Sequence, residues 1–459
     1  MASTYLTRTI STASNRRTWT WSAWIKRSDI TTGYQTLFSS DVDSNNMTRI
    51  LFWGTQQLTV SSKIGGSFPI DYRLTRTFRD TSAWYHIVVA MDTTQATDTN
   101  RLKIYINGVL ETAYEGSSAS LPSLDEDTWI NSTNPQIIGK SQTYDGLYGG
   151  SMSHIHFIDG TAYDATAFGE TDATTGEWEA KTSPSVTYGT NGFFILKDGN
   201  GITDQSGEGN DFTLGGGTLT DLKDNPDNVF ATLNPNYQST FATSRATLAN
   251  GNTKWTGSSN NTSQNAILST LGASSGKWYL EAKWVGTQDS QLVVAKSDFG
   301  MMTAGSGGFQ SAGWYGMITN ISNTGGSGMA WWSNNSATGD RGNTISTNDI
   351  IMMAIDIDNS KLYFGKNGTW EESGDPTSGA TGTGATSTLA SNTTYLVGCS
   401  NYGYDTANSW EFNFGNGYFG TTAITTNSGN GYEGAEGASK FNYTVPTGYS
   451  ALSTKGLNE

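Results

Sequence analysis

Apolar and polar side chains alternate along this sequence with a period of two almost everywhere, and no stretch keeps a helical period for more than a turn or two. Because successive side chains of a strand point to opposite faces, this pattern predicts an all-β protein. The first strong strand carries Trp19, Trp21, Ala23 and Ile25 on one face, which we expect to be buried. Trp24 has the opposite phase, so we expect its indole to be exposed.

The chain has 459 residues, which is too long for one ordinary domain and predicts two domains of roughly 200 residues each. It contains 15 Trp, 21 Tyr and 18 Phe, enough aromatic residues to build two cores and to exclude a disordered chain. Its 55 Gly follow no triplet repeat, which excludes collagen. Asn107-Gly108 and Asn367-Gly368 both predict tight hairpin turns, because Asn and Gly tolerate a positive φ.

Charge and cysteine content exclude several classes of function. With 26 basic and 41 acidic residues, the formal charge is −15, which argues against nucleic acid as a partner. Cys399 is the only cysteine, so no internal disulfide can form, and we expect it to be a small buried residue of a strand. No signal peptide and no membrane-spanning run is visible, so we expect synthesis in a cytoplasm without membrane insertion.

Two groups of strings resemble known families. WYHIVVAMD, RLKIYINGV, IIGKS and GGSMSHIHFIDG, within residues 15–165, resemble the laminin G-like family. GKWYLEAKW, DIIMMAIDIDNSKLYFGKNGTW and WEFNFGNGYF, within residues 275–420, are similar to the SPRY family. The first resemblance implies a concanavalin-like jelly-roll sandwich and the second a closely related sandwich. The expected fold class is therefore all-β, with two concanavalin-like jelly-roll β-sandwich domains in tandem.

The composition also suggests where these domains begin and end. We expect a laminin G-like sandwich over residues 1–217, a linker over 218–240, a SPRY-like sandwich over 241–445 and a carboxyl-terminal tail over 446–459. Residues 375–389 are almost purely Gly, Ser, Thr and Ala, so we expect a mobile loop that carries no core residue.

The whole arrangement resembles a family of phage proteins with a laminin G-like unit followed by a SPRY-like unit; the resemblance includes FIDGTAYDATAFGE, DQSGEGNDFTL, VFATLNPN and VPTGYSALSTKGL. It implies a non-enzymatic structural protein on the virion surface, such as a tail fibre, a spike or a head decoration. The partners it implies are other virion proteins, further copies of the chain and host surface polysaccharide. Tail or head location, the number of copies and the docking domain stay open. A lectin-type receptor-binding protein and a polysaccharide depolymerase are the alternatives.

A sugar site would need exposed aromatic rings beside polar groups. Trp331 and Trp332 are consecutive, so on a strand they point to opposite faces and one of them should leave the core. Further candidates lie in Gly-containing loops, where they could equally be interface or core-edge residues: Tyr144, Asp145, Tyr148, Tyr402 and Tyr404.

Metal and catalytic candidates are fewer, and no cofactor other than calcium is expected. A loose calcium site at Asp41, Asp43 and Asp145 competes with ordinary turn residues, and an EF-hand is excluded because its turn glycine and bidentate Glu are missing. His154 and His156 alternate with apolar residues, so we expect surface imidazoles rather than metal ligands. The best candidates for a glycosidase pair, Glu170, Asp172 and Glu177, occur in a polar segment that we expect to be a solvated loop.

Overall fold

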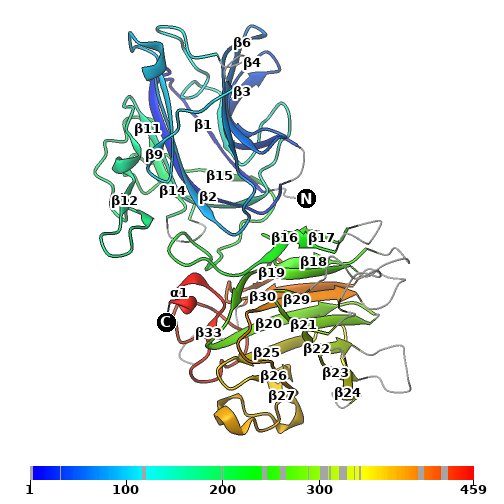
Figure 1. Ribbon diagram of the computed structural model, residues 1–459. Coiled ribbons are helices and arrows are strands. Elements are labelled where there is room, and N and C mark those ends of the chain that lie inside the picture. The colour runs from blue at the N-terminus through cyan, green and yellow to red at the C-terminus, as the bar shows by residue number, and fades with distance from the viewer. Residues whose placement is uncertain are drawn as a thin grey trace. The chain divides into compact units, whose positions relative to one another are not determined.

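The computed structural model describes residues 4–458 except 31–32, 116–119, 198, 200, 240–244, 259–264, 288, 300–308, 310–311, 320–327, 335, 341–342, 402–407 and 425–432. The chain divides into two compact units (Figure 1). The first comprises Met1–Asp221 with Asn225–Asp227, and the second comprises Leu222–Asp224 with Asn228–Glu459. Among the described residues, no helix has the length and apolar character needed to cross a bilayer.

The first unit is a sandwich of two antiparallel sheets. Its seven-stranded sheet has the order β15-β1-β10-β3-β4-β5-β6 and its six-stranded sheet the order β14-β11-β2-β7-β8-β9. The strands of the larger sheet are β1 (Tyr5–Thr9), β3 (Gln35–Asp43), β4 (Asn46–Phe52), β5 (Gln57–Ile64), β6 (Ser67–Thr77), β10 (Pro135–Ile138) and β15 (Thr213–Gly216). Those of the smaller sheet are β2 (Thr18–Arg27), β7 (Trp84–Asp92), β8 (Leu102–Ile106), β9 (Val109–Leu110), β11 (Gly150–Asp159) and β14 (Phe193–Ile195). The remaining elements are η1 (Asp98–Asn100), η2 (Ala165–Ala167), β12 (Gly169–Thr171) and β13 (Trp178–Ala180).

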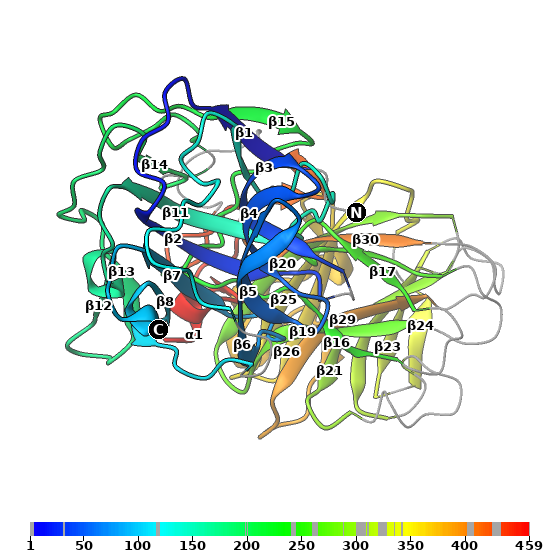
Figure 2. The ribbon, with the colours of Figure 1, turned by 90° about the horizontal axis from the view of Figure 1, so that it is seen from above.

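The second unit is also a sandwich, with sheet orders β16-β19-β29-β21-β22-β23-β24 and β17-β18-β30-β20-β25-β26-β27 (Figures 1 and 2). The first sheet contains β16 (Leu233–Gln238), β19 (Ala266–Ala273), β21 (Ser290–Lys296), β22 (Trp314–Thr319), β23 (Met329–Ser333), β24 (Ser336–Asp340) and β29 (Tyr395–Asn401). The second contains β17 (Thr247–Ala249), β18 (Lys254–Thr256), β20 (Lys277–Val285), β25 (Ile350–Asp356), β26 (Lys361–Lys366), β27 (Thr369–Trp370), β28 (Ser387–Thr388), β30 (Ser409–Asn413) and β33 (Ser450–Ala451). The remaining elements are β31 (Tyr418–Phe419), β32 (Thr422–Ala423), η3 (Glu371–Ser373), η4 (Pro376–Thr381) and α1 (Thr454–Leu457).

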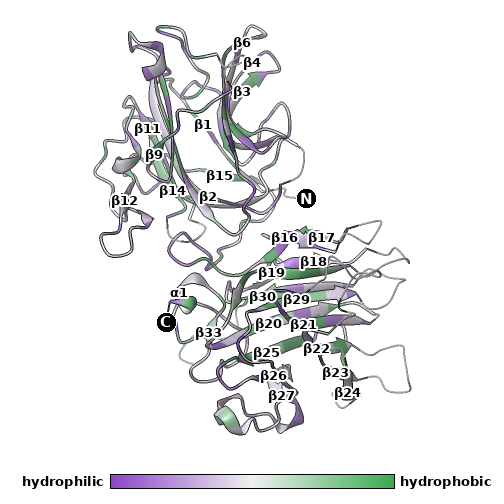
Figure 3. Ribbon diagram, in the orientation of Figure 1, coloured by the Kyte–Doolittle hydropathy of each residue, from purple (hydrophilic) through white to green (hydrophobic). Residues whose placement is uncertain are grey.

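Each core forms as the alternating pattern requires. In Figure 3 the strands of both units carry green segments interspersed with white and purple ones, as alternation requires. Trp19, Trp21, Ala23 and Ile25 are fully buried in the core of the first unit, as predicted. Cys399 is likewise fully buried, in the core of the second. The fold class predicted from the sequence is confirmed.

The ends of the second unit differ from the expected boundaries. Residues 218–240 were expected to be linker, but within them β16 pairs with β19 and Leu233 is fully buried in the core. The expected tail also belongs to the sandwich, because β33 pairs in parallel with β20 and Leu452 is buried. Apolar residues at both ends therefore complete the core, and the change of unit falls between residues 221 and 228.

The segment expected to be a mobile Gly/Ser/Thr loop is structured. Asp375 caps η4, β28 pairs with β26, and Pro376 and Leu389 are buried. The composition of this segment concealed the few residues that anchor it to the sheet.

An outer layer covers the six-stranded sheet of the first unit, and it corrects two expectations. Trp24 is only 4% exposed because its ring stacks on His86 at 5.0 Å, and His86 in turn stacks on Trp178 at 5.9 Å. His156 was expected on the surface but is 1% exposed, with Nδ1 lying 2.9 Å from the Tyr188 hydroxyl. The segment that follows β11 folds back over the sheet and buries these side chains.

A β-bulge explains the positions of the neighbouring histidines. The pairing of β11 with β2 shifts register between Ser153 and His156, and His154 has a φ of 47° at the bulge. His154 is half-buried rather than exposed. The extra residue of a bulge cannot be read from alternation alone, since the phase of the strand changes across it.

Both predicted Asn-Gly turns are present, with φ values of 49° and 81° at Asn107 and Gly108 and of 50° and 89° at Asn367 and Gly368. We expect Gly108→Ala to destabilise the first unit by about 2 kcal/mol in denaturant unfolding, since a side chain at this φ is strained. Its Cβ would also lie 2.6 Å from the Trp178 ring.

Gly65→Ala is the matched control for that substitution. Gly65 has a φ of +56°, and its Cβ would have no heavy atom within 4 Å. Gly65→Ala should therefore lower the free energy of unfolding only by the cost of the strained backbone, about 1 kcal/mol. Equal losses for the two variants would mean that Trp178 does not restrict the turn.

Candidate functional site

A row of polar side chains crosses the outward face of the seven-stranded sheet of the first unit. The register places Ser39 opposite Arg49, Arg49 opposite Ser61, and Ser61 opposite Asp71. Directly opposed residues of antiparallel strands project from the same face. The residues of the other phase in these strands belong to the core, so this row faces away from it.

Aromatic rings lie over the cations of this face. The Arg49 guanidinium lies 4.9 Å from the centre of the Tyr144 ring, and the Arg73 guanidinium 4.1 Å from that of Trp53. Tyr34 meets Trp53 edge to face at 4.6 Å. Tyr34 and Tyr144 remain 42% and 44% exposed, whereas Arg49 is only 5% exposed, so these rings reach the surface and the Arg49 cation is buried against them. We call these residues with Asp71 the Arg49 surface: Tyr34, Arg49, Trp53, Asp71, Arg73 and Tyr144.

The charges of the Arg49 surface are partly desolvated. Burial lowers the pKa of Arg49 from its ordinary value, an effect that Asp41, Tyr144, Tyr34 and Asp71 oppose. Burial raises the pKa of Asp71 above its ordinary value, and the positive charge of the neighbouring Arg73 offsets only part of this rise. At one edge, Arg73 pairs with Glu115 at 3.2 Å. Electrostatic and hydrogen-bonding interactions are stronger in such surroundings than in open water.

Several buried polar atoms on this side of the sheet have no hydrogen-bond partner within the described part of the chain. They are Thr36 Oγ1, Asp41 Oδ1, Arg49 Nε, Thr59 Oγ1, Asp71 Oδ1 and Arg73 Nε. A buried polar group without a partner costs about 1–3 kcal/mol. Both donors and acceptors occur among these atoms, so the polar row is incompletely paired below the surface in the described part of the chain.

The loop that carries Tyr144 is fixed by Asp41, so two predicted residues meet at this site. Asp41 Oδ2 accepts hydrogen bonds from the Ser141 hydroxyl and, at 3.1 Å, from Thr143 N–H. The Ser141 hydroxyl in turn accepts from Tyr144 N–H at 3.3 Å. Asp145 follows with a φ of 61° and pairs with Lys140 at 2.9 Å.

Other predicted sugar-binding residues lie elsewhere. Tyr148 is buried and donates its hydroxyl to the Lys26 carbonyl at 2.9 Å, so its ring cannot meet a sugar. Trp331 is 2% exposed and stacks on Phe364 in the core of the second unit, so it cannot bind a sugar as was expected. Trp332 has the opposite phase and is half-buried against Trp314. Tyr402 and Tyr404 lie outside the described residues.

The three aspartates predicted to hold calcium have other contacts. Asp43 accepts from Asn45 N–H and from the Asn46 side chain, and Asp145 pairs with Lys140. In the described parts of the chain, no group of three or more His, Cys, Asp or Glu side chains could hold a metal ion. Calcium at Asp41, Asp43 and Asp145 therefore stays a prediction that this arrangement does not support.

Sequence reasoning found Tyr144 but missed Tyr34, Arg49, Trp53 and Arg73. Each of these four lies on or beside the outward phase of β3–β6, a signal that was present in the alternation. The register that aligns the four strands was not visible, and it is the register that gathers these residues on one surface.

Comparison with known proteins supports the fold. A family model described as the concanavalin A-like lectin/glucanases superfamily matches residues 2–165, less than half of the chain. No curated protein matches the sequence significantly.

Solved structures similar to parts of the chain include three proteins, all at low identity. The SPRY domain of human HERC1 has 14% identity and a TM-score of 0.26, with 39% of this chain and 96% of that chain covered. Domain 4 of the arabinanase AbnA from Geobacillus stearothermophilus, in complex with arabinotriose, has 19% identity and a TM-score of 0.26, with 33% and 64% covered. A pentraxin from Limulus polyphemus has 15% identity and a TM-score of 0.23, with 35% and 71% covered.

Proposed function

We propose that this chain is a non-enzymatic carbohydrate-binding protein and that the Arg49 surface is its binding site. The observation that carries the proposal is the combination of exposed rings with a partly desolvated row of Arg and Asp side chains. Aromatic faces suit the C–H face of a sugar ring, and fixed donors and acceptors suit its hydroxyls. The superfamily match over residues 2–165 supports the same ligand class, because that superfamily includes lectins.

The binding test uses bacterial surface polysaccharide as the ligand. We expect Tyr144→Ala and Trp53→Ala each to weaken binding of the intact protein about tenfold, equivalent to ~1.4 kcal/mol. Each substitution removes one ring of the site, and neither residue lies in the core. Surface plasmon resonance on immobilised polysaccharide would measure the change.

Phe68→Ala is the matched control for these variants. Phe68 is 48% exposed on β6 and has the Lys63 ammonium 5.3 Å from its ring, but it is not part of the polar row. Phe68→Ala should leave the affinity for the polysaccharide unchanged. Retained binding in both Tyr144→Ala and Trp53→Ala, with their thermal transitions intact, would exclude the Arg49 surface.

The particle surface is the second part of the proposal. It rests on the resemblance of the whole chain to phage proteins that carry a laminin G-like unit followed by a SPRY-like unit. In this role the chain assembles with other virion proteins and with its own copies, and repetition strengthens weak glycan contacts. Mass spectrometry of purified particles should detect the chain, and its absence from intact virions would refute this role.

A depolymerase is the second candidate, and one observation favours it. Glu170 on β12 lies directly opposite Glu179 on β13, and paired carboxylates are what glycoside hydrolysis needs. Both side chains are exposed on a two-stranded hairpin, whereas the general acid of a glycosidase is held in an apolar pocket. We expect no new reducing ends when the protein is incubated with polysaccharide; their appearance, and loss in Glu170→Gln, would establish the enzyme instead.

A further inference from the structure

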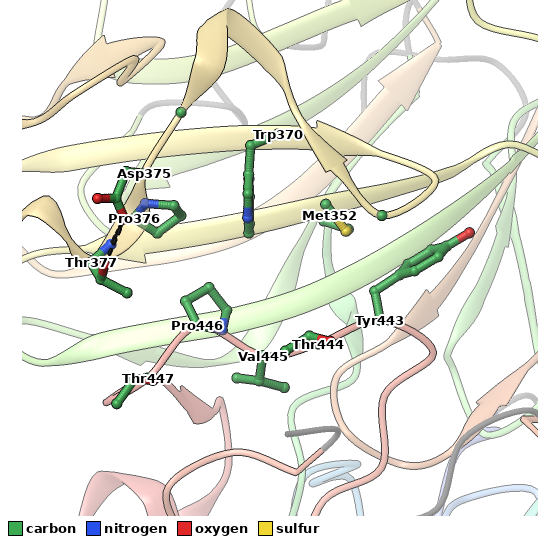
Figure 4. A pocket seen from close by; sticks show the side chains of 12 residues that line it. Met352, Trp370, Asp375, Pro376, Thr377, Tyr443, Thr444, Val445, Pro446 and Thr447 are labelled. Atoms are coloured by element: carbon green, nitrogen blue, oxygen red, sulfur yellow. Dashed lines mark hydrogen bonds between the residues drawn. The ribbon is translucent and has the colours of Figure 1, made fainter. Parts of the chain in front are cut away.

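A pocket of about 460 Å³ lies on the outward face of the nine-stranded sheet of the second unit (Figure 4). Buried Met352, Pro376 and Val445 line its apolar part, and half-buried Trp370 and Tyr443 add two aromatic rings. In Figure 4, Trp370 stands between Pro376 on one side and Met352 on the other. The volume is within the range of small-molecule sites, ~300–1,000 Å³.

The carboxyl-terminal wall of the pocket is held by a buried carboxylate. Glu281 on β20 is fully buried and accepts hydrogen bonds from Asn442 N–H and Tyr443 N–H, both at 2.8 Å. It also accepts the Tyr279 hydroxyl at 3.1 Å. The backbone that carries Tyr443 is therefore fixed before any ligand arrives.

The opposite wall is fixed as well. Asp375 Oδ1 accepts from Thr377 N–H at 2.9 Å and so caps η4. The Pro376 carbonyl accepts the hydroxyl of buried Tyr449 at 2.9 Å, which ties this wall to the carboxyl-terminal segment. Preorganised walls reduce the entropy lost on binding.

The lining selects the charge of the ligand. Asp375 is the one carboxylate among the residues that line this pocket, which include no Lys, Arg or His, and Asp349 adds negative charge near Tyr443. An anionic ligand is therefore repelled. Asp375 shares the exposed rim with the hydroxyls of Thr377, Thr444 and Thr447, which can donate and accept hydrogen bonds.

We propose that this pocket binds one neutral hexose residue, with its C–H face against the apolar part of the lining that includes Trp370 and its hydroxyls at the rim formed by Asp375 and the three threonines. The apolar part of the pocket provides the surface that a pyranose face needs, and the rim provides the partners that its hydroxyls need. The site is separate from the Arg49 surface and shares no residue with it, so the chain has two sites for carbohydrate. Experiments can therefore refute either of the two binding sites while the other stands.

The test is saturation-transfer NMR, which detects binding of the methyl glycosides of glucose, galactose and mannose to the intact chain. We expect saturation of at least one neutral glycoside, a loss of at least tenfold in affinity with Trp370→Ala, and a smaller loss with Trp370→Phe. Thr447→Val keeps the side-chain volume and removes one rim hydroxyl, so it should weaken binding of the glycoside. An unchanged thermal transition shows that this variant is folded. Phe68→Ala, in the first unit and outside the Arg49 surface, should have no effect on this signal.

Charged probes complete the experiment. Methyl glucuronide should bind more weakly than the matching neutral glycoside because of the acidic surroundings. A Trp370-dependent signal from tetramethylammonium in preference to the glycosides would assign the pocket to a cation and overturn the proposal. Absence of any Trp370-dependent signal from the three neutral glycosides would overturn it too, whatever the Arg49 surface binds.

Discussion

Acidification from pH 7 to pH 5 is expected to destabilise the first unit by about 4 kcal/mol, because two buried histidines resist protonation in the folded state. Burial lowers the pKa of His86 from 6.5 to about 3, with a smaller effect of His154. Burial also lowers the pKa of His156 well below its ordinary value, with smaller effects of His154 and His86.

The hydrogen bonds of His86 explain why its neutral form is favoured. Trp178 Nε1, which can only donate, lies 2.9 Å from His86 Nδ1, so Nδ1 must accept and carries no proton. The other nitrogen, Nε2, then bears the proton and faces the Ser22 hydroxyl at 2.9 Å. A second proton would convert Nδ1 into a donor that faces another donor.

The direction of the pH dependence follows from the number of protons that the folded and the unfolded states bind. Below about pH 6.5 the unfolded chain protonates both imidazoles, while the folded chain keeps them neutral. The unfolded state therefore binds more protons, and stability that is complete above this pH is lost as the pH falls. Each histidine contributes up to ~1.4 kcal/mol per pH unit, or about 2 kcal/mol at pH 5.

Differential scanning calorimetry between pH 8 and 5 measures this effect. For a unit of about 200 residues, 4 kcal/mol corresponds to a fall of roughly 8–16 °C in Tm. All three histidines lie in the first unit, so the second unit should not lose stability in this way as the pH falls. His86→Gln should remove about half of the pH dependence; an unchanged slope in this variant, or equal slopes for the two units, would contradict the explanation.

How far the sequence predicts this fold depends on which interactions are local. Alternation identified the strands, and local turn chemistry identified the Asn107-Gly108 and Asn367-Gly368 hairpins, because both depend on residues close in sequence. Trp24 was misplaced because Trp178, which covers its partner His86, follows it by more than a hundred residues. His156 was misplaced because Phe168 and Tyr188, which pack on it, lie outside its own strand. Alternation shows which face of a strand a residue occupies, but it does not show what covers that face.

The candidate sites show the same limit. Tyr144 and Asp41 were selected as local features of loops, yet the residues around them come from neighbouring strands and are aligned by register. The pocket of the second unit was missed because its walls, near Pro376 and near Tyr443, are about seventy residues apart; the first was expected to be part of a mobile loop and the second to lie at a domain edge. Its anchor, Glu281, is the one acid of β20, flanked by the apolar Leu280 and Ala282, and that was the available signal.

Glu281→Leu is expected to destabilise the second unit by about 3–5 kcal/mol, because it leaves several buried donors without an acceptor. Besides Asn442, Tyr443 and Tyr279, the side chain of Asn413 donates to Glu281 at 3.3 Å. Glu281→Gln tests the hydrogen bonds more directly, since it keeps the shape but turns one acceptor into an NH₂ group that faces N–H donors. We expect it to cost about 2 kcal/mol.

Glu281 should also give the second unit a pH dependence opposite to that of the first. Burial raises the pKa of Glu281 to about 7, although its hydrogen bonds lower it. Between about pH 4.5 and 7 the folded state keeps a proton that the unfolded state has released, so stability falls as the pH rises through this range and levels off above it. Calorimetry of the wild type and Glu281→Gln should show this slope only in the wild type. If Glu281→Gln were as stable as the wild type and still bound hexose in the pocket, Glu281 would not be what holds the carboxyl-terminal segment against the sheet.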